Sequence, residues 1–195
     1  MALNQLFAFG GSCDDVSLTA GGAAVCMRIR GPVAPSIHDL PDGAQVQLAG
    51  NGLPLQISQF GAPRTTGGYH TAGGQWDAVY SIWFGPTPNL ARQNHGTEIM
   101  IWGDHAGAPQ PAGQKVGATW DVWSGRLCGD GCWNVNSFVR QETTEALDLS
   151  IKDFTNDSVA RGITHPSWYL TSVQFGFEPW QGDPGLGVDS FSCKS

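Results

Sequence analysis

The sequence predicts an all-β protein, and three features support that prediction. Only 14% of the 195 residues are charged, while glycine (27 residues), proline (12) and tryptophan (8) are abundant. This composition suits many short strands joined by tight turns better than long, charged surface helices. Turn residues recur along the chain at 10–11, 21–22, 41–43, 50–52, 67–68, 73–74 and 129–131. Short runs rich in Val, Ile, Phe, Trp and Tyr separate these turns, as expected of antiparallel strands.

Seven of these runs have the apolar, β-branched and aromatic content of strands. They are Trp76–Phe84, Thr97–Gly103, Ala118–Ser124, Ser137–Arg140, Leu147–Lys152, Trp168–Phe177 and Gly187–Ser192. One helix is expected at Asp153–Arg161, with Asp153 as its N-cap and Gly162 in the position after its last residue. No linker, charge block or repeat divides the chain, so we expect residues 1–195 to form a single domain around one core.

Charge and hydropathy argue against two classes of partner. The net charge is −7, and the Lys and Arg residues are scattered singly, so the chain lacks the basic field that binds a phosphate backbone. No run approaches the ~20 apolar residues that a membrane-spanning helix requires, and Met1–Gln5 does not begin a signal peptide. We therefore expect neither a nucleic acid nor a membrane as partner.

Five cysteines leave at least one unpaired within the chain. Cys13 with Cys26 would close a short loop and Cys128 with Cys132 would clip a hairpin tip, as in proteins of an oxidising compartment, and Cys193 would stay free. The alternative is a zinc site that uses Cys128, Cys132 and a nearby His. No second Cys or His pair stands at zinc-like spacing, and the five histidines form no metal-binding motif, so we expect no metal.

Alternation along the strand expected at Thr97–Gly103 places an unusual set of side chains together. Glu98, Met100 and Trp102 share one face, because successive side chains of a strand point to opposite sides. The isoleucines between them point to the other face, which would be the core. A solvent-facing strand normally shows Thr, Lys or Gln, so this face predicts a groove for a flat, apolar ligand with polar edges.

A second glutamate lies on a polar face near the end of the strand expected at Trp168–Phe177. There Gln174 and Glu178 share a face, opposite a set of apolar core candidates. Sugars stack their C–H faces on Trp and bond through their hydroxyl edges. Two carboxyl groups can break a glycosidic bond, because one protonates the departing oxygen while the other attacks the anomeric carbon or activates water. Each glutamate alone is most simply a solvated strand residue, but the pair indicates catalysis.

These two strands resemble those of glycoside hydrolase family 12. Thr97–Trp102 is similar to the family's nucleophile strand, and Tyr169–Trp180 is similar to its acid/base strand. The resemblance continues in the family's order through Tyr80–Trp83, Trp120–Gly125, Val159–Gly162 and Gly185–Ser192. It covers about residues 53–192, whereas the first 50 or so match only loosely, around Pro35–Ile37.

The resemblance implies a jelly roll of two antiparallel sheets with a concave substrate cleft, which hydrolyses internal β-1,4 bonds of cellulose or related β-glucans with retention of configuration. It implies that Glu98 is the nucleophile and Glu178 the acid/base, the first ionised and the second protonated in a poorly solvated site. The residues that it implies in glucan binding are Met100, Trp102, Trp120, Gln174 and Trp180. It further implies a secreted monomer that needs no cofactor.

The chain departs from the family's pattern at Ser81, where the family usually carries an Asp that shares a hydrogen bond with the nucleophile. By parity Asp104 lies on the Glu98 face, but ~20 Å along the strand, which is too far to replace it. No Trp precedes Trp76, so distal sugar subsites would be weakened. We expect altered pH dependence or a reduced rate. A catalytically impaired β-glucan-binding protein of the same fold stays open as an alternative, and a xylanase of the related jelly-roll family is less favoured.

Overall fold

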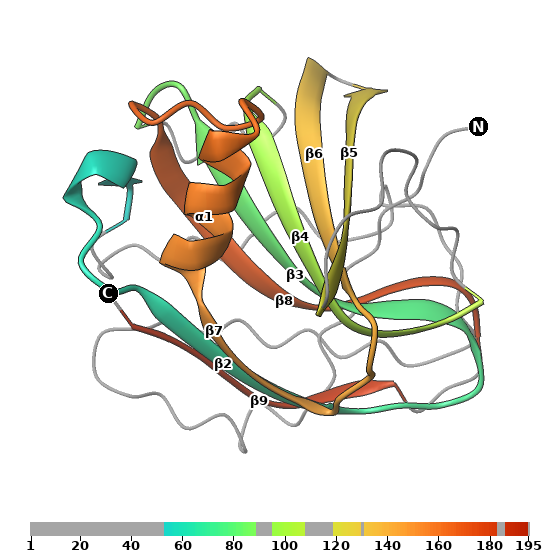
Figure 1. Ribbon diagram of the computed structural model, residues 1–195. Helices are drawn as coiled ribbons and strands as arrows, with labels where there is room; N and C mark the ends of the chain where they lie inside the picture. Colours follow the sequence, from blue (N-terminus) through green and yellow to red (C-terminus); the bar gives the residue numbers. More distant parts are fainter. Residues whose placement is uncertain (1–52, 89–94, 108–118, 130, 183–185, 195) are drawn as a thin grey trace, which may run out of the picture.

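The structure is a computed structural model that describes residues 53–88, 95–107, 119–129, 131–182 and 186–194, with backbone alone at 129, 179–182, 192 and 194. Its elements in chain order are β1 (Leu55–Gln56), the 3-10 helix η2 (Ile57–Gln59), β2 (Arg64–His70), β3 (Gly74–Gly85), β4 (Thr97–Ala106), β5 (Trp120–Gly129), β6 (Gly131–Arg140), β7 (Ala146–Ser150), α1 (Ile151–Ala160), β8 (Tyr169–Gly182) and β9 (Gly187–Lys194). Two sheets lie one over the other, with α1 beside the smaller sheet (Figure 1).

The larger sheet has the strand order β1-β8-β3-β4-β6-β5. Its neighbouring strands run antiparallel except β4 and β6, which are parallel. This parallel pair arises because β5 and β6 form a hairpin whose second strand, rather than its first, pairs with β4. The order places β4 and β8 on either side of β3, so the two strands that carry Glu98 and Glu178 share one neighbour.

The smaller sheet has the order β7-β2-β9, and its central strand was not predicted from the sequence. The turn expected at positions 67–68 was wrong, because both glycines lie within β2. A Cβ atom at Gly67 would lie 2.5 Å from both Phe175 Cε1 and Tyr80 Oη of the larger sheet. Glycine is required here because the backbone of β2 closely approaches the side chains of the opposite sheet.

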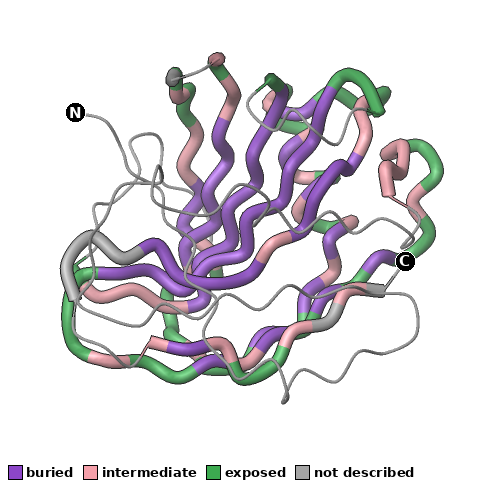
Figure 2. The backbone as a smooth tube through the Cα atoms, turned by 180° about the vertical axis from the view of Figure 1, so that it is seen from behind, coloured by how far each residue is buried: buried purple, intermediate pink, exposed green. Residues whose placement is uncertain are grey.

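The core lies between the two sheets and is dominated by aromatic side chains. Tyr80 of β3 stacks on Phe175 of β8 with 4.3 Å between ring centroids, and Tyr69 of β2 packs edge-on against Phe175 and Phe177. Figure 2 shows buried residues running through the strands of the larger sheet. Burial of side chains of this size stabilises the fold by roughly 1.5–3 kcal/mol each, so this layer holds the two sheets together.

Helix α1 begins two residues earlier than the sequence predicted. Its N-cap is Ser150, whose hydroxyl oxygen accepts the Asp153 backbone N–H at 3.3 Å, so Asp153 lies in the first turn and is not the cap. The strand expected at Leu147–Lys152 accordingly ends at Ser150. Gly162, with φ of +73°, follows the helix as predicted. The helix has ten residues, and no helix in the described ranges is long and apolar enough to cross a membrane.

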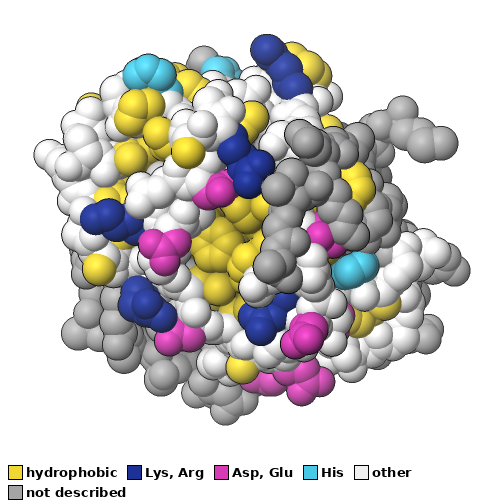
Figure 3. Space-filling model, in the orientation of Figure 1, with side chains coloured by type: hydrophobic (Ala, Val, Ile, Leu, Met, Phe, Trp, Pro, Cys, Tyr) yellow, Lys and Arg dark blue, Asp and Glu magenta, His cyan; other side chains and the backbone are white. Residues whose placement is uncertain are grey.

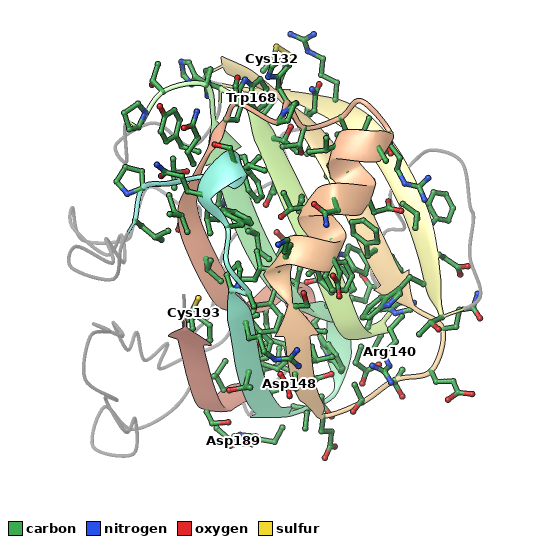
Figure 4. The ribbon with its side chains drawn as sticks, turned by 60° about the vertical axis from the view of Figure 1, so that its left-hand side comes forward. Cys132, Arg140, Asp148, Trp168, Asp189 and Cys193 are labelled. Atoms are coloured by element: carbon green, nitrogen blue, oxygen red, sulfur yellow. A yellow bond between two sulfur atoms is a disulfide. The ribbon has the colours of Figure 1, made fainter. Side chains whose placement is uncertain are left out.

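One of the two predicted disulfides is confirmed. Cys128 and Cys132 are bonded and join the ends of β5 and β6, which excludes the zinc site that used both as ligands. Cys193 is free, as predicted, and lies far from Cys132, on β9 of the smaller sheet (Figure 4). The predicted pair of Cys13 and Cys26 lies outside the described residues.

Candidate active site

Both glutamates lie on the face of the larger sheet that points away from the smaller sheet. We call this the site face, and the opposite side, which packs on the smaller sheet, the core face. Strand register arranges the site face in rows that cross neighbouring strands. The rows are Ser172–Trp83–Glu98–Val135, Gln174–Ser81–Met100–Ser137–Trp123, Gly176–Val79–Trp102–Val139–Asp121 and Glu178–Asp77–His105.

Glu98 is fully buried and accepts two side-chain hydrogen bonds. The Ser81 hydroxyl donates to its Oε1 at 2.6 Å, and the Trp133 indole N–H donates to its Oε2 at 3.0 Å. Burial raises the pKa of Glu98 to about 7, while the two donors oppose that shift by favouring the carboxylate. The site therefore orients both oxygens of Glu98 and leaves its charge available near neutral pH.

Ser81 contacts Glu98 directly. The hydroxyl supplies one donor and no charge, whereas an Asp at this position would place a second titratable group beside Glu98. Orientation of the carboxylate is thus retained at the position where the sequence departs from the pattern that it otherwise resembles. Electrostatic influence on Glu98 from this position is weaker than a carboxyl would exert.

A β-bulge in β4 overturns the parity argument for Asp104. Val79 pairs with Trp102 and Ala78 pairs with Asp104, so Gly103 is an extra residue in β4. Asp104 therefore turns to the core face, where Ala78 is buried. His105 is brought to the site face instead, in register with Asp77 and with its ring 5.8 Å from that of Trp102.

Glu178 is also buried, but its surroundings are acidic. It lies in register with Asp77 of β3, and its backbone N–H donates to Asp77 Oδ1 at 3.2 Å. Burial, then Asp77, then Glu98 hold the pKa of Glu178 well above its usual range. No described residue donates a hydrogen bond to its Oε1. These surroundings favour the protonated acid.

The two carboxyl groups thus have opposite environments on one face. Glu98 accepts hydrogen bonds from two neutral donors, which stabilise an anion, and Glu178 lies beside a second acid, which stabilises the protonated form. A buried carboxylate can attack a substrate atom, and a protonated carboxyl of raised pKa can donate a proton to one. Pairs of this kind carry acid-assisted nucleophilic chemistry.

Three of the five residues predicted to bind glucan lie on the site face with the glutamates. Met100 and Trp102 follow Glu98 along β4, and Gln174 lies in the row of Ser81. The backbone of Trp180 belongs to β8, but its side chain lies outside the described residues. The site face thus brings together candidates from both predicted strands.

Trp120 does not lie with the other predicted residues, because it occupies the core face of β5. Its ring packs edge-on against Phe154 of α1 at 5.3 Å, and the Arg140 guanidinium lies over it at 5.7 Å. There it lines a groove of about 660 Å³ between α1, β5 and β7. Figure 3 shows an apolar patch flanked by charged side chains on this side of the molecule. The assignment of Trp120 to the site was therefore wrong.

Two residues that contact the glutamates, Trp133 and Asp77, were not predicted from the sequence. Trp133 was overlooked because the strand was expected to begin at Ser137, whereas β6 begins at Gly131. The disulfide predicted between Cys128 and Cys132 could have revealed Trp133. A hairpin with its tip at 128–132 requires its second strand to begin next to Cys132, so Trp133 would lie within that strand. Asp77 was within an expected strand, but its acidic side chain was not placed. No group of three or more His, Cys, Asp and Glu among the described residues is arranged to hold a metal ion.

Comparison with known proteins identifies the same family along most of the chain. The protein-family model described as glycosyl hydrolase family 12 matches residues 49–194. A "Probable cellulase Cel12b" of Mycobacterium tuberculosis is 37% identical over 152 residues, which are 74% of this chain and 98% of that protein.

Solved structures share the fold. A cellulase structure named endo-1,4-beta-glucanase CelB2 matches with a TM-score of 0.64 and 40% identity, over 73% of this chain and 65% of that one. A family 12 xyloglucanase from Bacillus licheniformis matches with a TM-score of 0.68 and 30% identity, over 75% and 67%. These matches confirm the two-sheet jelly roll. Two other curated relatives are longer than this chain. The matched segment covers 56% of the length of one and 44% of the length of the other.

Proposed function

The chain belongs to glycosyl hydrolase family 12, and we propose that it hydrolyses internal β-1,4-glucosidic bonds of β-glucans with retention of configuration. The observation that carries the proposal is the pair of buried glutamates on one face of β4 and β8, one held by donors and the other beside an acid. Relatives named as a cellulase and a xyloglucanase support a β-glucan as the substrate class.

In the first step, the Glu98 carboxylate attacks the anomeric carbon while Glu178 gives its proton to the glycosidic oxygen. The carbon–oxygen bond of the substrate breaks, and a covalent glycosyl–Glu98 ester forms. Ser81 and Trp133 hold Glu98 in position for this attack through their two hydrogen bonds.

In the second step, Glu178, now ionised, takes a proton from water, and the water oxygen attacks the same carbon. The bond to Glu98 breaks, and the carboxylate of Glu98 and the proton on Glu178 are restored. Two inversions at one carbon give net retention.

The pH profile follows from the two carboxyl groups. Because Glu98 must be ionised, kcat/KM should rise with pH through about 7. Because Glu178 must be protonated, the profile should fall at higher pH, where that group loses its proton. We expect a bell-shaped profile with a neutral to alkaline optimum.

Reducing-sugar release from soluble β-glucan and carboxymethyl cellulose between pH 4 and 10 tests the proposal. Glu98→Gln and Glu178→Gln should each lose activity, whereas Glu142→Gln, which changes an exposed glutamate, should keep it. Parent protein that binds cello-oligosaccharide without cleaving it would support the alternative, a glucan-binding protein with impaired catalysis.

Two further measurements define the reaction and its substrate. NMR of the first products should show the β-anomer, and an initial α-anomer would contradict retention. Rates on mixed-linkage glucan, xyloglucan and xylan should favour a glucan, and higher activity on xylan would favour the xylanase alternative. The Cys128–Cys132 disulfide supports the further proposal that the protein is secreted, because such bonds persist in oxidising surroundings.

A further inference from the structure

We propose that Asp77 is a positioning residue that shares one proton with Glu178 and so keeps the acid/base protonated in the resting site. The inference rests on the proposed function, since it concerns the group that would protonate the leaving oxygen. It assigns a role to a buried acid that lies outside the pair of glutamates expected from the sequence.

Geometry brings the two acids together. Asp77 and Glu178 are register partners on the adjacent antiparallel strands β3 and β8, and such partners hold their Cβ atoms roughly 4.5–5.5 Å apart. The Glu178 backbone N–H donates to Asp77 Oδ1 at 3.2 Å, which fixes the Asp77 carboxyl beside Glu178. The residues are 0% and 4% exposed, so water contributes little to the solvation of either group.

Each acid has one oxygen that lacks a partner among the described residues. These atoms are Asp77 Oδ2 and Glu178 Oε1, and both are buried. A buried polar atom without a hydrogen bond is costly, and two neighbouring buried anions are costlier still. One proton on the pair removes one of the two neighbouring charges and gives the pair an O–H donor, so a singly protonated pair costs less than two anions.

The other charged groups near the pair do not replace this proton. From β4, Glu98 and His105 face it, and from β5 Asp121 lies on the same face with its Oδ1 accepting from Gln141 Nε2 at 3.0 Å. Burial, which acts first, and the acidic neighbours raise the pKa of Asp77 and of Glu178. Neither shift has a cationic cause.

Strand β3 therefore serves the two glutamates with different chemistry. Ser81 and Asp77 lie four residues apart on the same face of β3. The neutral hydroxyl of Ser81 contacts Glu98, and the carboxyl of Asp77 contacts Glu178. The hydroxyl lets Glu98 ionise, whereas the carboxyl resists ionisation of Glu178. One strand thus separates the protonation states that the two steps require.

The proton balance through the reaction is simple. The resting pair holds one proton, which passes to the glycosidic oxygen as the bond to Glu98 forms. The pair then holds none, and this unfavourable state draws a proton from the incoming water in the second step. The pair ends each turnover as it began.

The pH dependence of kcat/KM for Asp77→Asn tests the proposal in the full chain. The Asn side chain keeps an oxygen that can accept the Glu178 N–H, so the local backbone contact is retained. Without the second acid, the basic limb should move to lower pH by about one pH unit or more, while the acid limb set by Glu98 stays in place. A basic limb that stays in place would overturn the proposal.

His105→Asn is the matched control, because His105 occupies the other register position beside Asp77. The basic limb of the kcat/KM profile of His105→Asn should match that of the parent. A shift in this variant without a shift in Asp77→Asn would overturn the proposal and assign the effect to His105.

Infrared titration of carboxyl groups in the unliganded protein provides a readout that does not require turnover. The parent should show a carboxyl that keeps its proton well above the range of exposed glutamates and loses it at lower pH in Asp77→Asn. Identical titrations would overturn the proposal. If no glucan is hydrolysed, the proposed function fails, but this titration still decides whether the proton is shared.

Discussion

The core face and the site face of the larger sheet are both buried, yet they use burial in opposite ways. Phe175 of β8 points to the core face and stacks on Tyr80, so its burial stabilises the fold. Glu98 and Glu178 point to the site face, where burial raises their pKa values and costs stability whenever they ionise. One sheet can therefore keep a costly set of buried acids in place, because its other face holds the two sheets together.

The largest expected effect on stability comes from Phe175→Ala on the core face. Loss of this fully buried ring should lower the free energy of unfolding by about 3–5 kcal/mol, because a cavity opens beside Tyr80 and Tyr69. Urea unfolding of Phe175→Ala and the parent measures this change in the free energy of unfolding. The adjacent Gln174→Ala, on the site face, should cost less than about 1 kcal/mol. Equal losses in the two variants would show that the core face does not contribute more to stability than the site face.

The next effect concerns Glu98→Gln, which should stabilise the protein at high pH. The folded pKa of Glu98 is about 7 and its ordinary value is 4.5, so the folded state holds this proton more tightly and stability falls as pH rises from about 4.5 to 7. Glutamine avoids that loss, which amounts to about 3 kcal/mol above pH 7.

Unfolding of Glu98→Gln and parent at pH 4 and pH 8 measures this difference. The variant should gain stability over the parent at pH 8 and match it at pH 4, while Glu142→Gln should follow the parent at both. A variant less stable than the parent at pH 8 would show that burial of this carboxylate carries no cost.

A smaller effect is expected from Trp133→Phe, which removes one of the two donors to Glu98. The carboxylate loses a hydrogen bond, so the pKa of Glu98 should rise and the acid limb of kcat/KM should move to higher pH by about one pH unit. Trp123→Phe is the control on the same face, since no described contact joins its indole N–H to Glu98. Equal shifts in both variants would assign the effect to general loss of aromatic surface.

The smallest effect lies outside both faces, at the start of α1. Ser150→Ala removes the side-chain acceptor for the Asp153 N–H and should lower stability by about 1 kcal/mol. Ser150→Asp keeps an acceptor and should remain close to the parent. Thermal unfolding of the parent, Ser150→Ala and Ser150→Asp measures this loss of stability. A loss in Ser150→Asp as large as that in Ser150→Ala would contradict the capping role.

Much of the site could be predicted because alternation along single strands is a local property. Thr97–Gly103 has one face for Glu98, Met100 and Trp102, and that prediction needed no tertiary information. Contacts between strands could not be read in this way. The parallel pairing of β4 with β6 brings Trp133 to Glu98, and the β3–β8 register brings Asp77 to Glu178, and both depend on topology.

The fold was predicted less well where glycine serves packing rather than turning. Gly67 lies within β2 because the opposite sheet leaves no room for a Cβ atom, and a local pattern cannot distinguish that reason from a turn. Trp120 was misplaced because a strand motif does not reveal which face meets the helix. Gly162 was placed correctly because its left-handed conformation follows from the end of the helix itself.

The extra residue Gly103 divides β4 into two segments with opposite numbering parity. An engineer who varies the site face by choosing every second position would follow 98, 100 and 102, and would then need to continue at 105. A library that continued at 104 would instead randomise the interior side of the strand end and yield unstable clones. Deletion of Gly103 would exchange the directions of Asp104 and His105, so one codon controls which of these side chains lies on the site face.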